Sequence, residues 1–116
     1  MATNFLTKEL QNLGTTPTPL TGTYTSGDVT VHAIYASNTH ATDTIGFYLV
    51  LYDNSSTNQI KANILYNVEI SPKSTLVVEK PINLTASDTG ATQRQLKVHA
   101  STGTDLDVVA SILEIT

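Results

Sequence analysis

The sequence contains no cysteine, few charged residues and no long apolar run. Without cysteine, disulfide bonds, zinc–thiolate sites and thiol nucleophiles are excluded, so the fold depends on packing and on backbone hydrogen bonds. Six Lys and Arg against ten Asp and Glu give a net charge of −4, and the basic residues form no cluster. Because non-specific nucleic-acid binding needs a surplus of basic side chains to displace counterions, no nucleic-acid partner is expected.

Signals for membranes, export and common enzyme chemistry are also missing. No apolar stretch approaches the roughly 20 residues that a membrane-spanning helix needs, so no membrane partner is expected. The opening MATNFLTK does not combine a basic segment with a long apolar one, so no secretory signal is expected. No GxSxG, P-loop or GxGxxG pattern occurs. The sequence therefore predicts no enzyme, no catalytic residues and no cofactor.

Threonine, serine and asparagine dominate what is present, with 20, 9 and 8 copies among 116 residues. Thr, Val, Ile and Tyr favour strands, whereas Asn, Ser, Gly and Pro favour turns. Alternating runs between turn-forming residues predict strands over residues 20–25, 29–37, 44–52, 60–70, 75–79, 82–84, 95–101 and 104–116. This pattern predicts one all-β domain, a single antiparallel β-sandwich that is jelly-roll-like and has about eight strands.

The longest strand-forming run is the last one, residues 104–116. Side chains alternate along a strand, so Leu106, Val108, Ala110 and Ile112 share one apolar face. The opposite face begins with polar residues and ends with apolar ones. This pattern is typical of a central strand that runs from solvent into a covered region.

Three other strands have predicted faces, and in residues 95–101 the side chains of Leu96, Val98 and Ala100 are expected to point inward. Residues 44–52 place an apolar set on one face, and the opposite face is also largely apolar, so this strand is expected to be covered on both sides. In residues 29–37, the predicted faces are Val29, Val31, Ala33 and Tyr35 against Thr30, His32, Ile34 and Ala36. Residues 60–70 are long for one strand, so a bulge is expected within Leu65-Tyr66-Asn67.

The N-terminal residues 1–19 are expected to form an arm or an edge strand ahead of a sandwich domain over residues 20–116. Residues 5–12 favour a strand over a short helix, and two prolines within residues 14–19 indicate an extended crossover outside the sheet interior. Such an arm can cover its own sheet edge or add a strand to a neighbouring subunit. Its apolar residues Phe5, Leu6 and Leu10 are the candidate partner-binding residues. The long polar loop over residues 86–93 is a second candidate contact surface.

The titratable residues do not predict a chemical site. His32, His40 and His99 lack the spacing of a metal site, and solvent-facing or interfacial histidines are the favoured interpretation. Asp105 and Asp107 lie about 7 Å apart on one strand face, where a solvated strand end is favoured over acid–base chemistry.

Two further sets of residues were candidates for ligand binding. Residues 53–58, DNSSTN, are rich in oxygen ligands but lack the glycine and glutamate of a calcium loop. Five tyrosines can form a sugar-stacking or interface patch, although core-edge packing is the favoured interpretation. These tyrosines are Tyr24, Tyr35, Tyr48, Tyr52 and Tyr66.

Several segments, taken in order, resemble those of small structural proteins of tailed-bacteriophage virions. The segments are GTTP (14–17), IYASNT (34–39), VEISPKSTL (68–76), KPINL (80–84), ASD (86–88), LKV (96–98) and DVVASILEIT (107–116). The terminal SILEIT is the sharpest match. The chain departs from the family where an Ala-Gly-Asp turn usually leads directly into Leu-Lys-Val. Here Ser87 replaces the glycine and residues 89–95 intervene, which indicates a local elaboration.

The resemblance implies a non-enzymatic virion component, made in the host cytoplasm. The favoured interpretation is a capsid decoration (cement) protein that binds the capsid lattice as a homo-oligomer, for example a trimer. Its partners would be itself and the major capsid protein or other virion proteins. A head–tail neck or tail accessory protein is the alternative. A carbohydrate-binding β-sandwich is a third interpretation, and it predicts exposed tyrosines in a shallow groove.

Overall fold

The computed structural model describes residues 3–21, 28–53, 59–85 and 94–115. No helix in this part of the chain is long and apolar enough to cross a membrane. Its strands are β1 (Thr3–Leu13), β2 (Thr18–Pro19), β3 (Asp28–Asn38), β4 (Ile45–Asp53), β5 (Gln59–Ile70), β6 (Thr75–Val78), β7 (Ile82–Thr85), β8 (Arg94–Ala100) and β9 (Leu106–Ile115). The predicted loops at residues 54–58 and 86–93 lie outside the described residues.

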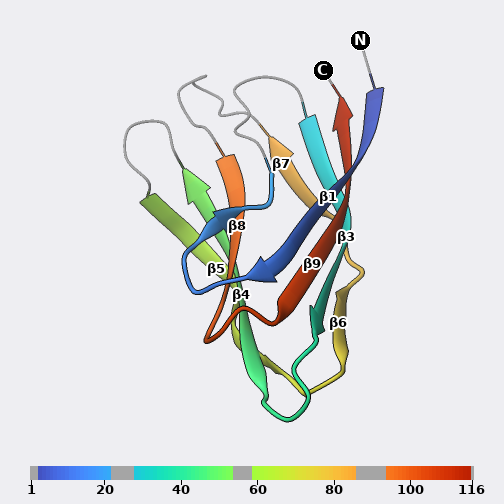
Figure 1. Cartoon of the computed structure of the whole chain (residues 1–116). Helices are drawn as coiled ribbons and strands as arrows, with labels where there is room; N and C mark the ends of the chain where they lie inside the picture. Colours follow the sequence, from blue (N-terminus) through green and yellow to red (C-terminus); the bar gives the residue numbers. More distant parts are fainter. Residues whose placement is uncertain (1–2, 22–27, 54–58, 86–93, 116) are drawn as a thin grey trace.

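The strands form two antiparallel sheets that face each other (Figure 1). One has the order β1-β9-β3-β6, with β7 also paired to β3, and the other has the order β2-β8-β4-β5. Strands β6 and β7 pair with the two halves of β3 and act as one strand that is interrupted near Pro81. The pairs β1/β9, β2/β8, β3/β6–β7 and β4/β5 are therefore nested, like one long hairpin rolled into two layers. This topology confirms the all-β, jelly-roll-like sandwich with about eight strands.

The core lies between the two sheets and confirms the predicted faces of three strands. Strand β9 lies between β1 and β3, and its four predicted core residues are at most 3% exposed. Strand β4 buries Phe47 and Leu49, and it also buries Val50 and Tyr52 on its other side, as expected for a strand covered on both faces. Strand β8 buries Leu96, Val98 and Ala100.

The predicted faces of residues 29–37 are wrong in the second half of the strand. Val31 pairs with Ile112 and Ala33 pairs with Ser111, so His32 is an extra residue without a partner on β9. This bulge shifts the alternation by one residue. The buried set is therefore Val29, Val31, Ile34 and Ala36, while Tyr35 points outward and is exposed.

The predicted strand over residues 20–25 is also misplaced. Pairing with β8 occurs at Thr18 and Pro19. Leu20 already lies in a bend, and its N–H donates to the Leu96 carbonyl at 2.8 Å. Strand β2 is the edge of its sheet, where proline costs no interior ladder bond. Residues 22–25 lie outside the described part.

Asn38 holds together the end of the molecule where β3 leads into β4. Its side chain is 1% exposed. Its Nδ2 donates to the carbonyls of Asp43 (2.8 Å) and Ile70 (2.9 Å), and its Oδ1 accepts the His40 N–H at 2.9 Å. A buried amide with three bonds is well satisfied. Asn38 is therefore a structural residue that ties the 39–44 turn to the end of β5.

Candidate functional site

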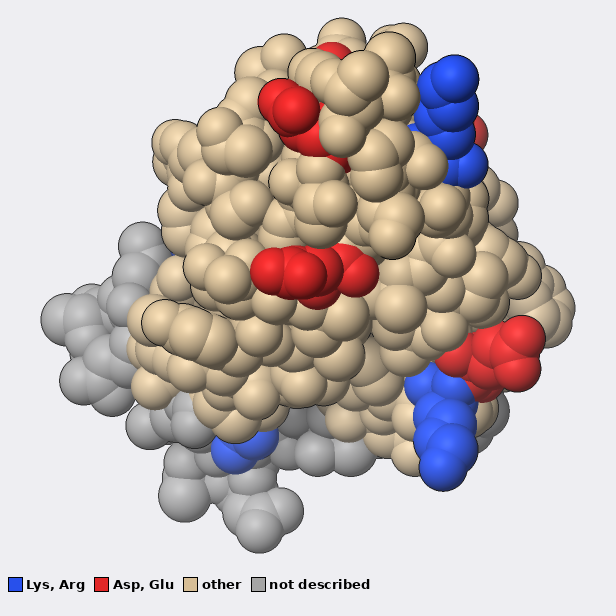
Figure 2. Space-filling view, turned by 90° about the horizontal axis from the view of Figure 1, so that it is seen from below, with Lys and Arg blue, Asp and Glu red and all other residues tan. Residues whose placement is uncertain are grey.

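The three histidines lie in different parts of the fold and do not form a common site. His32 is exposed at the β3 bulge, His40 lies in the turn after β3, and His99 lies on the outer face of the four-stranded sheet. Within the described residues, no group of three or more His, Cys, Asp or Glu side chains is placed to hold a metal ion. Seen from below, the molecule shows a few scattered charged side chains on a largely uncharged surface (Figure 2).

His40 has a structural role. Its Nδ1 accepts the N–H groups of Thr42 (3.1 Å) and Asp43 (2.9 Å), so its hydrogen is on Nε2. That nitrogen lies 3.5 Å from Asp43 Oδ2 and 4.0 Å from Asp105 Oδ2. The Thr39 N–H donates to the Asp105 carbonyl at 2.8 Å. These contacts fix the turn after β3 against the β8–β9 connection.

Asp107 acts separately from Asp105. Its Oδ1 accepts the backbone N–H of Asn12 at 3.0 Å. Asn12 has a φ of 57° at the point where the β1–β9 register shifts. The carboxylate therefore satisfies a donor in an irregular part of β1.

The predicted partner-binding residues lie on β1, which pairs with β9 at the edge of its sheet. Phe5 is 77% exposed and Leu6 is 43% exposed, whereas Leu10 is partly buried against the core. Phe5 points outward because Leu6, on the next position, pairs with the buried Ile112.

Exposed apolar side chains lie at two places on the outer side of the five-stranded sheet, with Phe5 opposite Leu113 and a second group nearer the start of β9. Tyr35 pairs with Val109 on one side and Val77 on the other, and all three are exposed. We call Phe5, Tyr35, Val77 and Val109 the outer apolar face. Contiguous exposed apolar side chains, such as those of Tyr35, Val77 and Val109, are a feature of surfaces that meet a partner.

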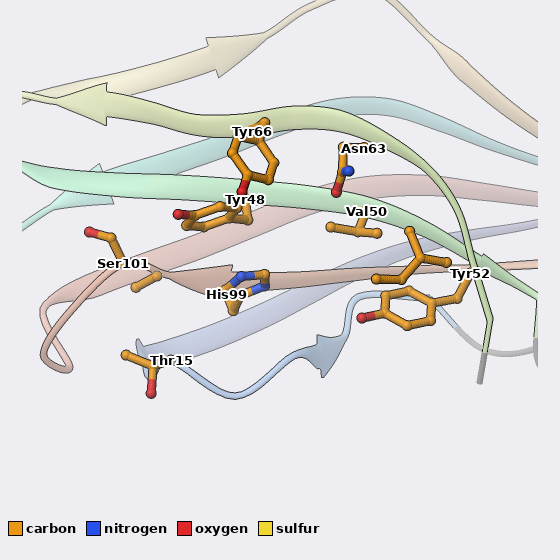
Figure 3. A pocket seen from close by; sticks show the side chains of 10 residues that line it. Thr15, Tyr48, Val50, Tyr52, Asn63, Tyr66, His99 and Ser101 are labelled. Atoms are coloured by element: carbon orange, nitrogen blue, oxygen red, sulfur yellow. The ribbon is translucent and has the colours of Figure 1, made fainter.

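A hollow of about 430 Å³ lies on the outer side of the other sheet (Figure 3). Two strands supply most of its lining, with Tyr48, Val50 and Tyr52 from β4 and Ile60, Asn63 and Tyr66 from β5. His99 and Ser101, at the end of β8, and Thr15, before β2, lie along the opposite side. The hollow is lined by both apolar and hydroxyl- or amide-bearing side chains.

Register shifts in β5 create this lining. Opposite β4, strand β5 contains three shifts, each of which adds one residue to β5. Ile60 consequently pairs with Tyr52, Asn63 pairs with Val50, and Tyr66 lies beside Tyr48. On a regular strand, every second side chain points to the same side. The three extra residues make every third residue of β5, at positions 60, 63 and 66, point to the side of the hollow. The expected irregularity at residues 65–67 is confirmed, and two more occur nearer the start of the strand.

The aromatic side chains in the hollow contact one another. Tyr48 stacks on His99 with ring centroids 4.2 Å apart and an interplanar angle of 8°. Tyr66 meets Tyr48 edge to face, at 5.2 Å and 83°, and is 69% exposed. Tyr52 is buried beneath Lys97, whose Nζ lies 4.6 Å from the ring centroid. Three of the five tyrosines thus gather here, while Tyr35 is on the other sheet and Tyr24 lies outside the described residues.

The described residues that line the hollow include no Lys, Arg, Asp or Glu. One charged group lies beside it, the Lys97 ammonium over the Tyr52 ring. Burial lowers the pKa of His99 below its ordinary value of 6.5, because desolvation disfavours the imidazolium. The His99 Nδ1 is buried, and the structure shows no hydrogen-bond partner for it.

The sequence patterns did not place Asn63, Thr15 and Ser101 beside the hollow that they line. A signal was available, because Asn is depleted in strands and two occur within the strand-forming run of residues 60–70. One of them, Asn67, has a φ of 50°. These asparagines mark places where regular pairing ends.

Comparisons with known proteins gave matches only at the level of structure. No family model matches the chain, and no curated protein matches it. The chain is similar to the capsid protein in the T13 particle of infectious bursal disease virus (IBDV), with a TM-score of 0.55 and 9% identity. That match covers 97% of this chain but 31% of the viral one, so the chain spans about a third of it.

Two smaller proteins match over most of both chains. A chain from the acid-stable capsid of the Helicobacter pylori bacteriophage KHP30 has a TM-score of 0.53 and 10% identity, covering 99% of this chain and 89% of that one. A subunit of the disulfide-linked pili of Bacillus endospore appendages has a TM-score of 0.56 and 9% identity, covering 99% and 87%. At these identities the likeness establishes the fold, which is a β-sandwich found in viral capsids and in a spore pilus.

Proposed function

We propose that this chain is a non-enzymatic structural protein of a bacteriophage particle, and specifically a capsid decoration protein that binds the capsid lattice as a homo-oligomer. The observation that carries the proposal is the likeness to a phage capsid chain over nearly the whole length of both. The segments that resemble tailed-phage virion proteins support the same conclusion independently of the fold. Among the described residues, His40 and Asp107 accept backbone N–H groups, which is a structural role.

The outer apolar face supports binding to a repeated protein surface. It carries Phe5, Tyr35, Val77 and Val109 on one sheet, and exposed apolar area of this kind is costly unless a partner covers it. A symmetric oligomer presents several copies of such a face to the lattice at once. Weak individual contacts then add up to stable attachment.

The N-terminal segment has a specific part in this proposal. Strand β1 is paired with β9 from Thr3 to Leu13, and Leu13 is buried in the core. We propose that residues 3–19 stay on their own sandwich and bind the partner through the exposed parts of Phe5 and Leu6, which lie on opposite faces of β1. Leu10, which packs against the core, would hold the strand in place.

Absence of cysteine separates this proposal from a pilus subunit of the related fold. The Bacillus appendages are disulfide-linked, whereas these 116 residues contain no cysteine. The chain therefore cannot supply such links, and its assembly would depend on noncovalent contacts.

The proposal is tested by cosedimentation of the purified protein with capsids that lack it. The wild-type protein should be oligomeric in solution and pellet with capsids, while Phe5→Ser combined with Val77→Ser should weaken binding at least tenfold. Both positions are exposed, so the melting temperature should change little. Tyr66→Ser, on the other sheet, is the matched control and should bind like the wild type. A stable monomer that does not bind capsids would refute the proposal.

A further inference from the structure

We propose that the hollow on the outer face of β4, β5 and β8 is a binding site for a neutral sugar. The site lies on the opposite sheet from the outer apolar face, so the inference does not depend on the proposed capsid contact. Its volume of about 430 Å³ falls within the range of about 300–1,000 Å³ that is common for small-ligand sites.

The aromatic side chains supply a stacking surface for the C–H face of a sugar ring. Tyr66 is 69% exposed, although it is a large aromatic residue in a long strand. Tyr48 is held against His99 by stacking at 4.2 Å, and Tyr66 is held against Tyr48 at 5.2 Å. The rings are thereby kept in place before a ligand arrives, which lowers the entropic cost of binding.

Polar groups around these rings are available for sugar hydroxyls. The structure shows no hydrogen bond from the side chains of Tyr48, Tyr66, Asn63 or Thr15 to any other described residue. Ser101 Oγ accepts the Gly46 N–H at 2.8 Å and keeps its own O–H to donate. Amide and hydroxyl groups beside an aromatic ring match a molecule that has both C–H faces and hydroxyl edges.

The absence of charge in the lining selects the class of sugar. A carboxylate, sulfate or phosphate on the ligand would lose water without gaining an oppositely charged partner. The described lining has no Lys or Arg, the nearby Lys97 ammonium is held over the Tyr52 ring, and burial lowers the pKa of His99, which disfavours its charged form. A neutral hexose or a neutral oligosaccharide is therefore favoured over sialylated or phosphorylated glycans.

The three extra residues of β5 provide an independent reason to regard the hollow as a built site. Each one interrupts the ladder with β4, and Asn67 adopts a positive φ of 50°. Bulges are enriched next to functional sites because they redirect side chains. Their combined effect here is to place Ile60, Asn63 and Tyr66 on one side of β5, facing the β4 residues of the hollow.

The inference is tested first with a glycan array. The full chain is then titrated with the methyl glycoside of a sugar that the array shows to bind. We expect binding to neutral glycans and none to their sialylated or phosphorylated forms. Tyr66→Ala should weaken affinity at least tenfold and Asn63→Ala at least threefold. Tyr35→Ala, an exposed tyrosine on the other sheet, is the matched control and should not change affinity.

Titration by NMR provides a second readout that does not depend on the variants. The His99 ring signals should shift as the sugar binds, whereas those of His32 should not.

Three outcomes would overturn the inference. They are no binding to neutral glycans at millimolar concentration, equal binding by the wild type and Tyr66→Ala, and binding restricted to charged glycans. If Tyr66→Ser loses capsid binding and the wild type binds no glycan, the hollow is a protein contact, and the inference of a sugar site is overturned. Loss of capsid binding through the outer apolar face leaves the inference intact, so the two proposals fail separately.

Discussion

Gly46 shows how a single residue position in β4 depends on the irregular strand beside it. A methyl group at this position would overlap the side-chain amide of Asn67 and come within 3.2 Å of Ser101 Cβ. Gly46 also donates its N–H to Ser101 Oγ and accepts the Ser101 N–H at 2.9 Å. The backbone is thus fixed on both sides, and the Asn67 side chain is the group that must move.

Replacing Gly46 by alanine should lower the free energy of unfolding by about 1–3 kcal/mol, the usual cost of overpacking. Asn67→Gly alone should have a small effect, because glycine accepts the positive φ of that position. The double variant should recover most of the loss, since the clashing amide is gone. Urea unfolding of the four proteins gives the coupling energy, and strictly additive losses would contradict the contact.

His99 makes stability depend on pH in a defined direction. Burial lowers its pKa in the folded protein below 6.5, so the unfolded chain binds a proton at a higher pH than the folded one. The free energy of unfolding therefore falls as the pH drops below about 6.5, and the contribution is fully present above it. His99→Gln should show a shallower loss of stability between pH 7 and pH 5 than the wild type. An NMR titration midpoint for His99 at or above 6.5 would contradict the assignment.

At the scale of the strand, the sequence predicted regular elements well and irregular ones poorly. Strands β4, β8 and β9 keep a period of two through their core residues, and their buried faces were correctly predicted. Strand β3 changes face at His32, and β5 changes face three times. A bulge is decided by which residues the neighbouring strand can pair with, so alternation in one segment does not reveal it.

Strand β1 has one side chain that packs against the core and one that points to solvent, and two substitutions distinguish their effects on stability. Leu10→Ala should lower the free energy of unfolding by about 1–3 kcal/mol, because Leu10 packs against the core. Phe5→Ser should leave stability nearly unchanged, since Phe5 is largely exposed. Thermal unfolding of both variants measures this difference. Equal destabilisation would show that Phe5 packs on its own sandwich and is not available to a partner.

At the scale of the whole molecule, composition was enough to predict the class of fold. The wealth of Thr, Ser and Asn and the absence of cysteine indicated an all-β sandwich held by packing. The nested pairing of the strands could not be predicted from the sequence, because it depends on contacts between β1 and β9 at opposite ends of the chain. Both candidate surfaces arise from this pairing. The outer apolar face takes its residues from β1, β9, β3 and β6 of one sheet, and the hollow needs β5 and β8 on either side of β4.

The molecule as a whole presents two different outer surfaces on one small sandwich. The outer apolar face is suited to a protein lattice, and the neutral aromatic hollow on the opposite sheet is suited to a sugar. Because the outer sides of the two packed sheets point in opposite directions (Figure 1), a subunit attached through the outer apolar face would leave the hollow available. The two activities would then be compatible in one particle.

Quantitative mass spectrometry of purified particles, combined with a map of the intact virion, tests the central proposal most directly. A decoration protein should be present at a copy number comparable to that of the major capsid protein. It should lie on the capsid surface with Phe5 and Val77 at the contact. A copy number that is a small fraction of the major capsid protein, with density confined to the neck or tail, would contradict the account.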